Sequence, residues 1–207
     1  MSNSVVSSEA TTNSHEEIAK RAAAAFWHCE PKDTFAQSLS ALYPWLHKHS
    51  IFLVKNIKHV KILVVVSQEG VATPFPSANA IGPLNGLLES ENIQLPDSLS
   101  PEKLSSAIRA FTLGPGGFVA SPSFWDAQQR SLKMWTTRDP TGGPALFHKY
   151  CQNPVLSREG QHWKLDFYYF NDKGGVEKWS ASGDAREVLD IDSSPAAPDG
   201  TFVFPYG

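Results

Sequence analysis

The chain has 207 residues, with 18 Lys and Arg against 21 Asp and Glu, so its formal net charge is −3. Hydrophobic residues make up 41% and charged residues 19%, proportions that exclude a disordered protein. No apolar run approaches the ~18 residues that a membrane-spanning helix needs, and two cysteines are too few for a disulfide scaffold. We therefore expect a globular, cytoplasmic protein without a membrane span.

The chain begins with a polar segment, 1–14, that is rich in Ser, Thr and Asn. It has neither the basic start nor the apolar core of a secretory signal, so we expect a flexible tail followed by a single domain over 15–207. Ser14 is a suitable helix N-cap. We predict a first helix from Ser14 to about Cys29, ending before Pro31.

A second helix is predicted with Asp33 or Thr34 as its N-cap, because apolar residues recur after this point at helical spacing. Two strands follow. The run 51–54 is short, whereas 60–66 is almost continuously apolar and β-branched, which favours a strand with both faces covered. The segment 72–86 is rich in Pro and Gly and predicts a long loop, with one helical turn near Leu84–Leu88. The residues of the helical pattern are Phe35, Leu39, Leu42 and Leu46.

Two later helices have the same start signal, a serine followed by proline. Ser100 precedes Pro101, and Ser121 precedes Pro122; a serine N-cap with proline at the first helical position is a typical helix start. The glycine-rich segment 114–117 ends the first of these helices. A further short helix is predicted over 145–151.

The last third of the chain alternates with period two. Apolar and polar residues alternate over 163–170, a turn follows at 171–175, and 176–181 is suited to be the second strand. This pattern predicts an antiparallel hairpin. The runs 187–192 and 201–204 add two strands.

This order of elements predicts the α+β class: N-terminal and central helices packed on a mostly antiparallel sheet dominated by a C-terminal β meander. We expect the strand 60–66 in the same sheet. The element order near the chain ends resembles the helix-over-curved-sheet architecture of nuclear-transport-factor-like small-ligand domains. The helical segment 80–151 departs from that pattern, so no functional residue is transferred.

Charge is distributed unevenly. Residues 34–68 contain no acid but four lysines and three histidines, whereas 184–199 contain five acids and one arginine. The simpler interpretation is two solvated faces that attract each other weakly. The alternative is a basic strip for an anionic partner, whose binding would depend on salt. The net charge of −3 makes nucleic acid an unexpected partner.

Six tryptophans in this chain suggest an aromatic-lined pocket between helices and sheet. Asp166 stands among aromatic residues on a predicted strand, and a covered carboxyl group there could act as a general acid or base with His148 or His162. The simpler interpretation is that Asp166 faces water. The residues expected to line the pocket are Trp125, Trp135, Trp163, Tyr168 and Trp179.

Three weaker candidates involve metal ions or anions. The mixed imidazole and thiol set His28, Cys29, His148 and Cys151 has the donor types of a zinc site, but free cysteine is commonly a small buried hydrophobe. Asp190 and Asp192 share a strand face. The glycines of 114–117 precede a predicted helix but lack the residues of a phosphate-binding loop. We therefore predict no metal and no organic cofactor.

No motif decides between the remaining function classes. We expect a non-catalytic small-ligand-binding or protein-interaction domain with an aromatic-lined pocket, whose partner is a small apolar or aromatic molecule or another protein. The alternative is a small cofactor-independent enzyme using His/Asp acid–base catalysis in that pocket. A homodimer is compatible with either class.

Overall fold

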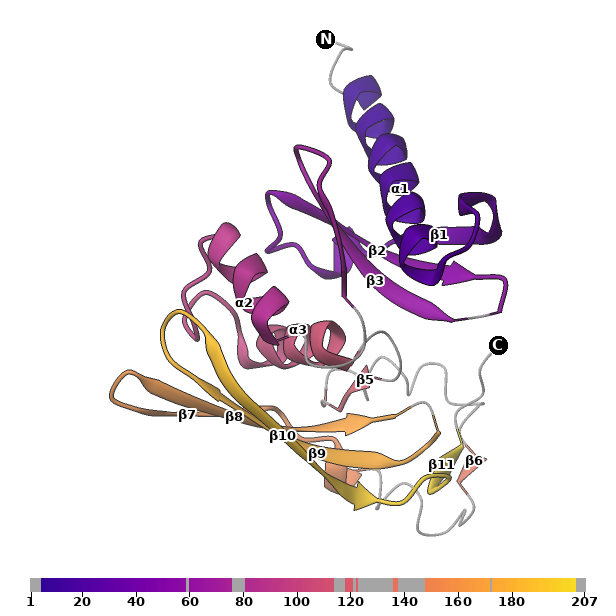
Figure 1. Cartoon of the computed structure of the whole chain (residues 1–207). Helices are drawn as coiled ribbons and strands as arrows, with labels where there is room; N and C mark the ends of the chain where they lie inside the picture. Colours follow the sequence, from indigo (N-terminus) through magenta and orange to yellow (C-terminus); the bar gives the residue numbers. More distant parts are fainter. Residues whose placement is uncertain are drawn as a thin grey trace. The chain divides into compact units, whose positions relative to one another are not determined.

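The computed structural model describes residues 5–58, 60–75, 81–113, 118–120, 122, 136–137, 148–171 and 173–203. The chain folds as two compact units (Figure 1). The first comprises Met1–Asn92 with Ala110–Pro115, and the second Ile93–Arg109 with Gly116–Gly207. The expected division into a tail and one domain stays a prediction. Within the described residues, no helix combines the length and apolar character that crossing a membrane requires.

The first unit contains a four-stranded antiparallel sheet with the strand order β1-β2-β3-β4. The strands follow one another in the sequence, so each connection is a simple hairpin. The register is continuous from Thr34 opposite Asn56 to Ser38 opposite Phe52. The bounds are β1 Thr34–Ser38, β2 His49–Asn56, β3 Lys61–Ser67 and β4 Ala72–Phe75.

Helix α1, Val5–Trp27, covers one face of this sheet (Figure 1). It begins nine residues before the start that we predicted at Ser14, so that prediction is wrong. Ser, Thr and Asn disfavour a helix only weakly, and extending a helix that is already formed is far easier than starting one. Ala19 and Ala23 are fully buried, and their small side chains let the helix approach the strands. They pack with alternate strand residues: Phe52, Val54, Ile62, Val64 and Val66.

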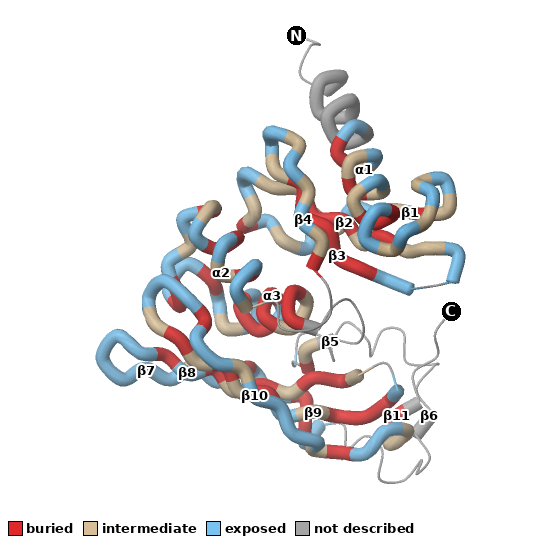
Figure 2. The backbone as a smooth tube through the Cα atoms, viewed as in Figure 1, coloured by how far each residue is buried: buried red, intermediate tan, exposed pale blue. Residues whose placement is uncertain are grey.

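The opposite face of the same sheet is also covered. Phe75 on β4 lies opposite Leu63 on β3, and the Phe75 ring is 4.9 Å from the ring of Phe111, centroid to centroid. Tyr43 and Trp45 meet Phe111 edge to face. All five central residues of β3 are consequently buried, as Figure 2 shows. The prediction of a strand with both faces covered at 60–66 is confirmed.

The second predicted helix, after Thr34, is wrong. The segment forms β1, flanked by two 3-10 turns, Pro31–Asp33 and Ser40–Leu42. The apolar residues that suggested a helix do not form a buried stripe, since Phe35 is 64% and Leu42 is 70% exposed. Pairing with β2 provides the backbone hydrogen bonds of this segment. The spacing of its apolar residues carries no information about a partner strand that lies further along the chain.

The segment 72–86, predicted as a long loop with one helical turn near 84–88, has regular structure at both ends, and the predicted turn is part of a longer helix. β4 occupies its start, and helix α2, Ile81–Ser90, begins before it ends. Leu84, Leu87 and Leu88 are the buried face of α2. Residues 76–80 lie outside the described part of the chain.

The second unit contains an antiparallel sheet in the order β10-β9-β8-β5, with β7 also pairing with β8. The α+β class and the C-terminal meander are confirmed. The single sheet that we expected is wrong, because β3 and the meander belong to separate sheets. The bounds are β5 Phe118–Val119, β7 Val155–Glu159, β8 His162–Phe170, β9 Val176–Gly183 and β10 Val188–Ala197, with a separate pair of β6 Thr136–Thr137 and β11 Phe202–Val203.

Helix α3, Pro101–Leu113, begins as the sequence predicts. The backbone N–H of Lys103 donates to Ser100 Oγ over 3.3 Å, which is an N-cap hydrogen bond. Most of the helix predicted from Ser121 lies outside the described residues. Of the short helix predicted over 145–151, the structure describes helical residues at 148–150.

Candidate functional site

Three side chains form a row across strands β1, β2 and β3 of the first sheet. Phe35 on β1 lies directly opposite Lys55 on β2, and Lys55 lies directly opposite Lys61 on β3. Residues opposite each other across antiparallel strands project from the same face. The row lies on the face away from α1, because α1 packs on the alternate residues Val54 and Ile62. We call these three residues the cationic row.

The cationic row lies at an exposed end of the sheet. Phe35 is 64% exposed, and Ile57 and Val60, which lie in the connection between β2 and β3, are 62% and 48% exposed. Lys61 is exposed and Lys55 half-buried. Ile57, two residues after Lys55, projects from the same face as the row, whereas Val60 alternates with Lys61 and projects from the other face. Exposed large apolar side chains on the same face as charged ones are a usual composition for a binding surface.

Lys55 and Lys61 place two positive charges on one face of the sheet. Among the described residues, neither lysine forms an ion pair, and 34–68 contain no acid. Asp33 lies near the row, because its backbone carbonyl accepts the N–H of Ile57, two residues after Lys55. Like charges directly opposite each other in a sheet reduce its stability. An anionic partner would remove this repulsion.

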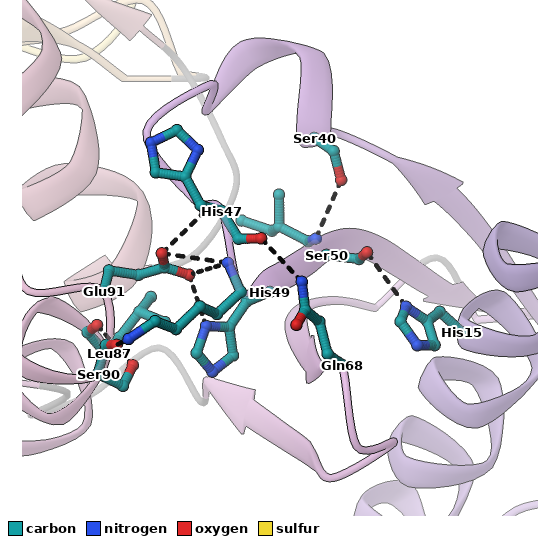
Figure 3. Close-up of polar contacts among 11 residues, drawn as sticks. His15, Ser40, His47, His49, Ser50, Gln68, Leu87, Ser90 and Glu91 are labelled. Atoms are coloured by element: carbon teal, nitrogen blue, oxygen red, sulfur yellow. Dashed lines mark hydrogen bonds and ion pairs between the residues drawn. The ribbon is translucent and has the colours of Figure 1, made fainter. Parts of the chain in front are cut away.

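A second cluster lies at the other end of β2, around Glu91 (Figure 3). The Glu91 side chain has no exposed surface. Its carboxylate accepts the backbone N–H of His47 over 2.8 Å and that of Lys48 over 2.9 Å. The Nδ1 atom of His49 is 2.7 Å from Glu91 Oε1. Figure 3 shows the His49 ring turned towards Glu91 and the His47 ring turned away from it.

These contacts determine the ionisation of Glu91. Burial alone raises the pKa of a carboxyl group. The hydrogen bonds from the His49 ring and from the backbone of His47 and Lys48 outweigh burial, so the pKa of Glu91 lies below its ordinary value. Glu91 is therefore a carboxylate near neutral pH, and it fixes the orientation of the His49 ring.

A histidine–serine contact lies on the other side of β2. His15 Nδ1 is 3.2 Å from Ser50 Oγ, and His15 is buried. Ser50 follows His49, and successive side chains of a strand project from opposite faces. The pair therefore belongs to the α1 side of the sheet and is separate from the Glu91 cluster.

In the second unit, the structure brings together some of the residues predicted to line an aromatic pocket. Trp163 and Trp179 are both buried. Trp179 stacks on Phe167 with 5.9 Å between ring centroids, and Trp163 Nε1 donates to the carbonyl of Asp184 over 2.6 Å. Tyr168 alternates with Phe167 along β8 and meets Tyr150 instead, so it projects from the opposite face. Trp125 and Trp135 lie outside the described residues.

The predicted catalytic residues lie apart along the strand. Asp166 and His162 are both on β8, where Asp166 pairs with Ser180 and His162 with Glu159. They share a face, but four residues separate them, which is about 13 Å along a strand. Asp166 Oδ1 is 3.6 Å from Lys164 Nζ. His148 is exposed and lies on the short helical segment.

One arrangement in this unit was not predicted from sequence. The guanidinium of Arg109, on α3, lies 3.8 Å from the centroid of the Tyr169 ring and 5.5 Å from that of Trp179. Cation–π contacts of this kind favour a charge beside aromatic rings. Of these residues only Trp179 was predicted from sequence to line a site, and no sequence signal pairs Tyr169 and Trp179 with an arginine 60 and 70 positions earlier.

The described residues contain no group of three or more His, Cys, Asp or Glu side chains that could hold a metal ion. Cys29 and Cys151 are free cysteines, and burial raises the pKa of the Cys151 thiol to about 12. The Cys151 side chain is therefore a neutral thiol in the structure described. Asp190 and Asp192 are exposed on β10. The glycines of 114–117 lie outside the described residues.

Comparisons with known proteins give no independent assignment of function: no family model, no curated protein and no solved structure matches.

Proposed function

We propose that this protein is a non-catalytic interaction domain that binds another protein through the cationic row and the exposed Ile57 beside it. The observation that carries the proposal is the alignment of Phe35, Lys55 and Lys61 across three strands. An exposed aromatic ring supplies contact area at low entropic cost, and the two cations select the charge of the partner.

A peptide-display selection tests this function without a known partner. A library of random peptides is selected on the wild-type protein, and the enriched peptides are scored on Phe35→Ser. Phe26→Ser is the matched control, since Phe26 is a 46% exposed phenylalanine on α1 in the same unit. We expect enriched peptides that lose binding to Phe35→Ser and keep it on Phe26→Ser. Peptides that are indifferent to Phe35 would contradict the proposal.

Small-ligand binding in an aromatic-lined pocket remains a prediction. Its support is the burial of Trp163 and Trp179 on one face of the second sheet. Tyr168 projects from the other face, so it and the two tryptophans do not line one side of the sheet.

The Glu91 cluster supports a second candidate function, acid–base catalysis, at residues other than those predicted. A buried carboxylate hydrogen-bonded to one nitrogen of a histidine ring orients the other nitrogen for proton transfer. The His49 side chain is 16% exposed, so part of its ring reaches solvent.

Hydrolysis of p-nitrophenyl acetate tests this candidate directly. We expect His49→Ala to lose the catalysed component above the buffer rate, whereas His162→Ala, which removes an exposed histidine of β8, retains it. Equal rates for wild type and His49→Ala would exclude this candidate.

A further inference from the structure

Strand β1 is an edge of the first sheet with one side open. Among the described residues, β2 is the only strand that pairs with it. An open edge presents unpaired backbone N–H and C=O groups to any extended chain that approaches it.

The hydrogen-bond pattern identifies which groups of β1 point outwards. Leu39 N donates to the Ile51 carbonyl, and Ile57 N donates to the Asp33 carbonyl. In an antiparallel pair such bonded positions alternate with non-bonded ones, so the odd-numbered residues of β1 bond β2. The backbone N–H and C=O groups of Ala36 and Ser38 therefore face the open edge.

The edge strands of the two sheets differ in how well they are protected against pairing with another strand. β10, an edge of the second sheet, carries Asp190, Asp192 and Pro195 and has two register shifts. Charges, proline and bulges of this kind prevent edge-to-edge pairing. β4, the other edge of the first sheet, contains Pro74. β1 has no charge, no proline and no break in register.

The charges near this edge select the partner. Adjacent strands lie about 4.8 Å apart, so a strand added to β1 would lie about 10 Å from Lys55, with Phe35 between them. An extended lysine and a glutamate side chain together span that distance. Lys61 lies on the other side of Lys55, away from the β1 edge. Repulsion between the two ammonium groups therefore favours side-chain conformations in which the Lys55 ammonium lies towards β1.

We propose that β1 receives an extended, acid-bearing segment of a partner protein as an added strand. The partner's backbone bonds Ala36 and Ser38, the aliphatic stem of an acidic residue lies over Phe35, and its carboxylate meets Lys55. This is strand addition, in which backbone hydrogen bonds supply affinity and alternate side chains supply specificity. The inference rests on the proposed function and names its partner class and binding mode.

The test uses a synthetic blocked peptide in which Val or Thr alternates with Glu, titrated into the full-length protein and followed by NMR. We expect saturable shifts of the Ala36 and Ser38 amide signals and slower hydrogen exchange of both. Binding should weaken as salt is raised. A matched peptide with Lys in place of Glu should not bind, and neither should the Glu peptide carrying N-methyl groups at alternate residues.

Variants locate the side-chain contacts. We expect Lys55→Gln to weaken binding about two- to fivefold and Phe35→Ser roughly tenfold, whereas Lys178→Gln, at an exposed position of β9, leaves it unchanged. Wild-type and variant amide spectra outside β1 establish that each variant is folded.

Each other outcome overturns the inference in a recognisable way. Binding that tolerates N-methylation and leaves Ala36 and Ser38 undisturbed would exclude strand addition but retain the proposed interaction surface. Equal binding of the Lys peptide would exclude an acidic partner. Displacement of the Glu peptide by single-stranded oligothymidylate at Phe35 would indicate a nucleic-acid surface instead. No binding of the Glu peptide would overturn the inference outright, while the display selection tests the proposed function independently.

Discussion

Lys55 on β2 lies directly opposite Lys61 on β3, and among the described residues neither lysine has an acidic partner. Two like charges facing each other across a sheet cost roughly 0.2–1 kcal/mol. The arrangement reduces the stability of the isolated protein, and an anionic partner at this position would offset the cost.

Lys61→Gln should therefore stabilise the protein. We expect the free energy of unfolding to rise by roughly 0.2–1 kcal/mol at low salt, and the gain to shrink at high salt because ions screen the repulsion. Urea unfolding at two ionic strengths measures it. Lys178→Gln is the control, since Lys178 faces Tyr168 rather than another lysine. A loss of stability in Lys61→Gln at low salt would contradict the prediction.

Glu91→Gln should destabilise the first unit by about 1–3 kcal/mol. The carboxylate accepts hydrogen bonds from His47, Lys48 and His49, whereas a glutamine amide has one acceptor oxygen and turns an NH₂ group towards donors. Urea unfolding measures the change. Glu89→Gln, at an exposed position of α2, is the control. Equal stability of the two variants would show that the Glu91 contacts contribute little.

The same residue predicts a pH dependence. Because the folded-state pKa of Glu91 lies below its ordinary value, its contribution to stability is present above the unfolded pKa of about 4.3. It is lost as pH falls through the folded pKa. We expect wild type to lose more stability than Glu91→Gln between pH 6 and pH 3, roughly. Parallel stability curves for the two proteins would contradict this assignment.

The two cysteines should differ in reactivity. Burial raises the pKa of Cys151 to about 12, so its thiolate fraction at pH 8 is on the order of one in ten thousand. Cys29 is half-buried and lies two residues after the last residue of α1, Trp27. We expect iodoacetamide to modify Cys29 well before Cys151 in the native protein, as measured by peptide mass spectrometry. Faster modification of Cys151 would show that it is accessible and activated.

Gly174→Ala should destabilise the second unit far more than Gly160→Ala. Both glycines have positive φ, +77° and +62°, which costs an alanine about 1–2 kcal/mol. A Cβ at Gly160 meets nothing within 4 Å, whereas a Cβ at Gly174 overlaps the carbonyl oxygen of Phe202. Thermal or urea unfolding measures the stability lost by each variant, which is due to backbone strain alone in Gly160→Ala and to strain plus a steric clash in Gly174→Ala. Equal losses would show that the turn adjusts around Phe202.

Several elements could be predicted from sequence because their signals are local. The alternation over 163–170 and the turn that follows specify the hairpin of β8 and β9. Ser100 and Pro101 mark the start of α3, and the β-branched run at 60–66 marks a strand covered on both faces. In each case the residues that carry the pattern are those that form the element, so period and capping suffice.

Tertiary structure decided the rest. The spacing of Phe35 and Leu42 predicted a helix, but the segment forms β1 and pairs with β2. Backbone hydrogen bonds to a distant strand outweigh a local pattern whose apolar residues remain exposed. The acid-free segment was visible in the sequence, but only the strand register places Lys55 between Phe35 and Lys61. The contact of His49 with Glu91 joins residues 42 positions apart, and no spacing rule links residues that meet only when the end of α2 lies beside the start of β2. Composition and periodicity thus specify elements, whereas the surfaces and polar clusters that could carry function depend on how those elements pair.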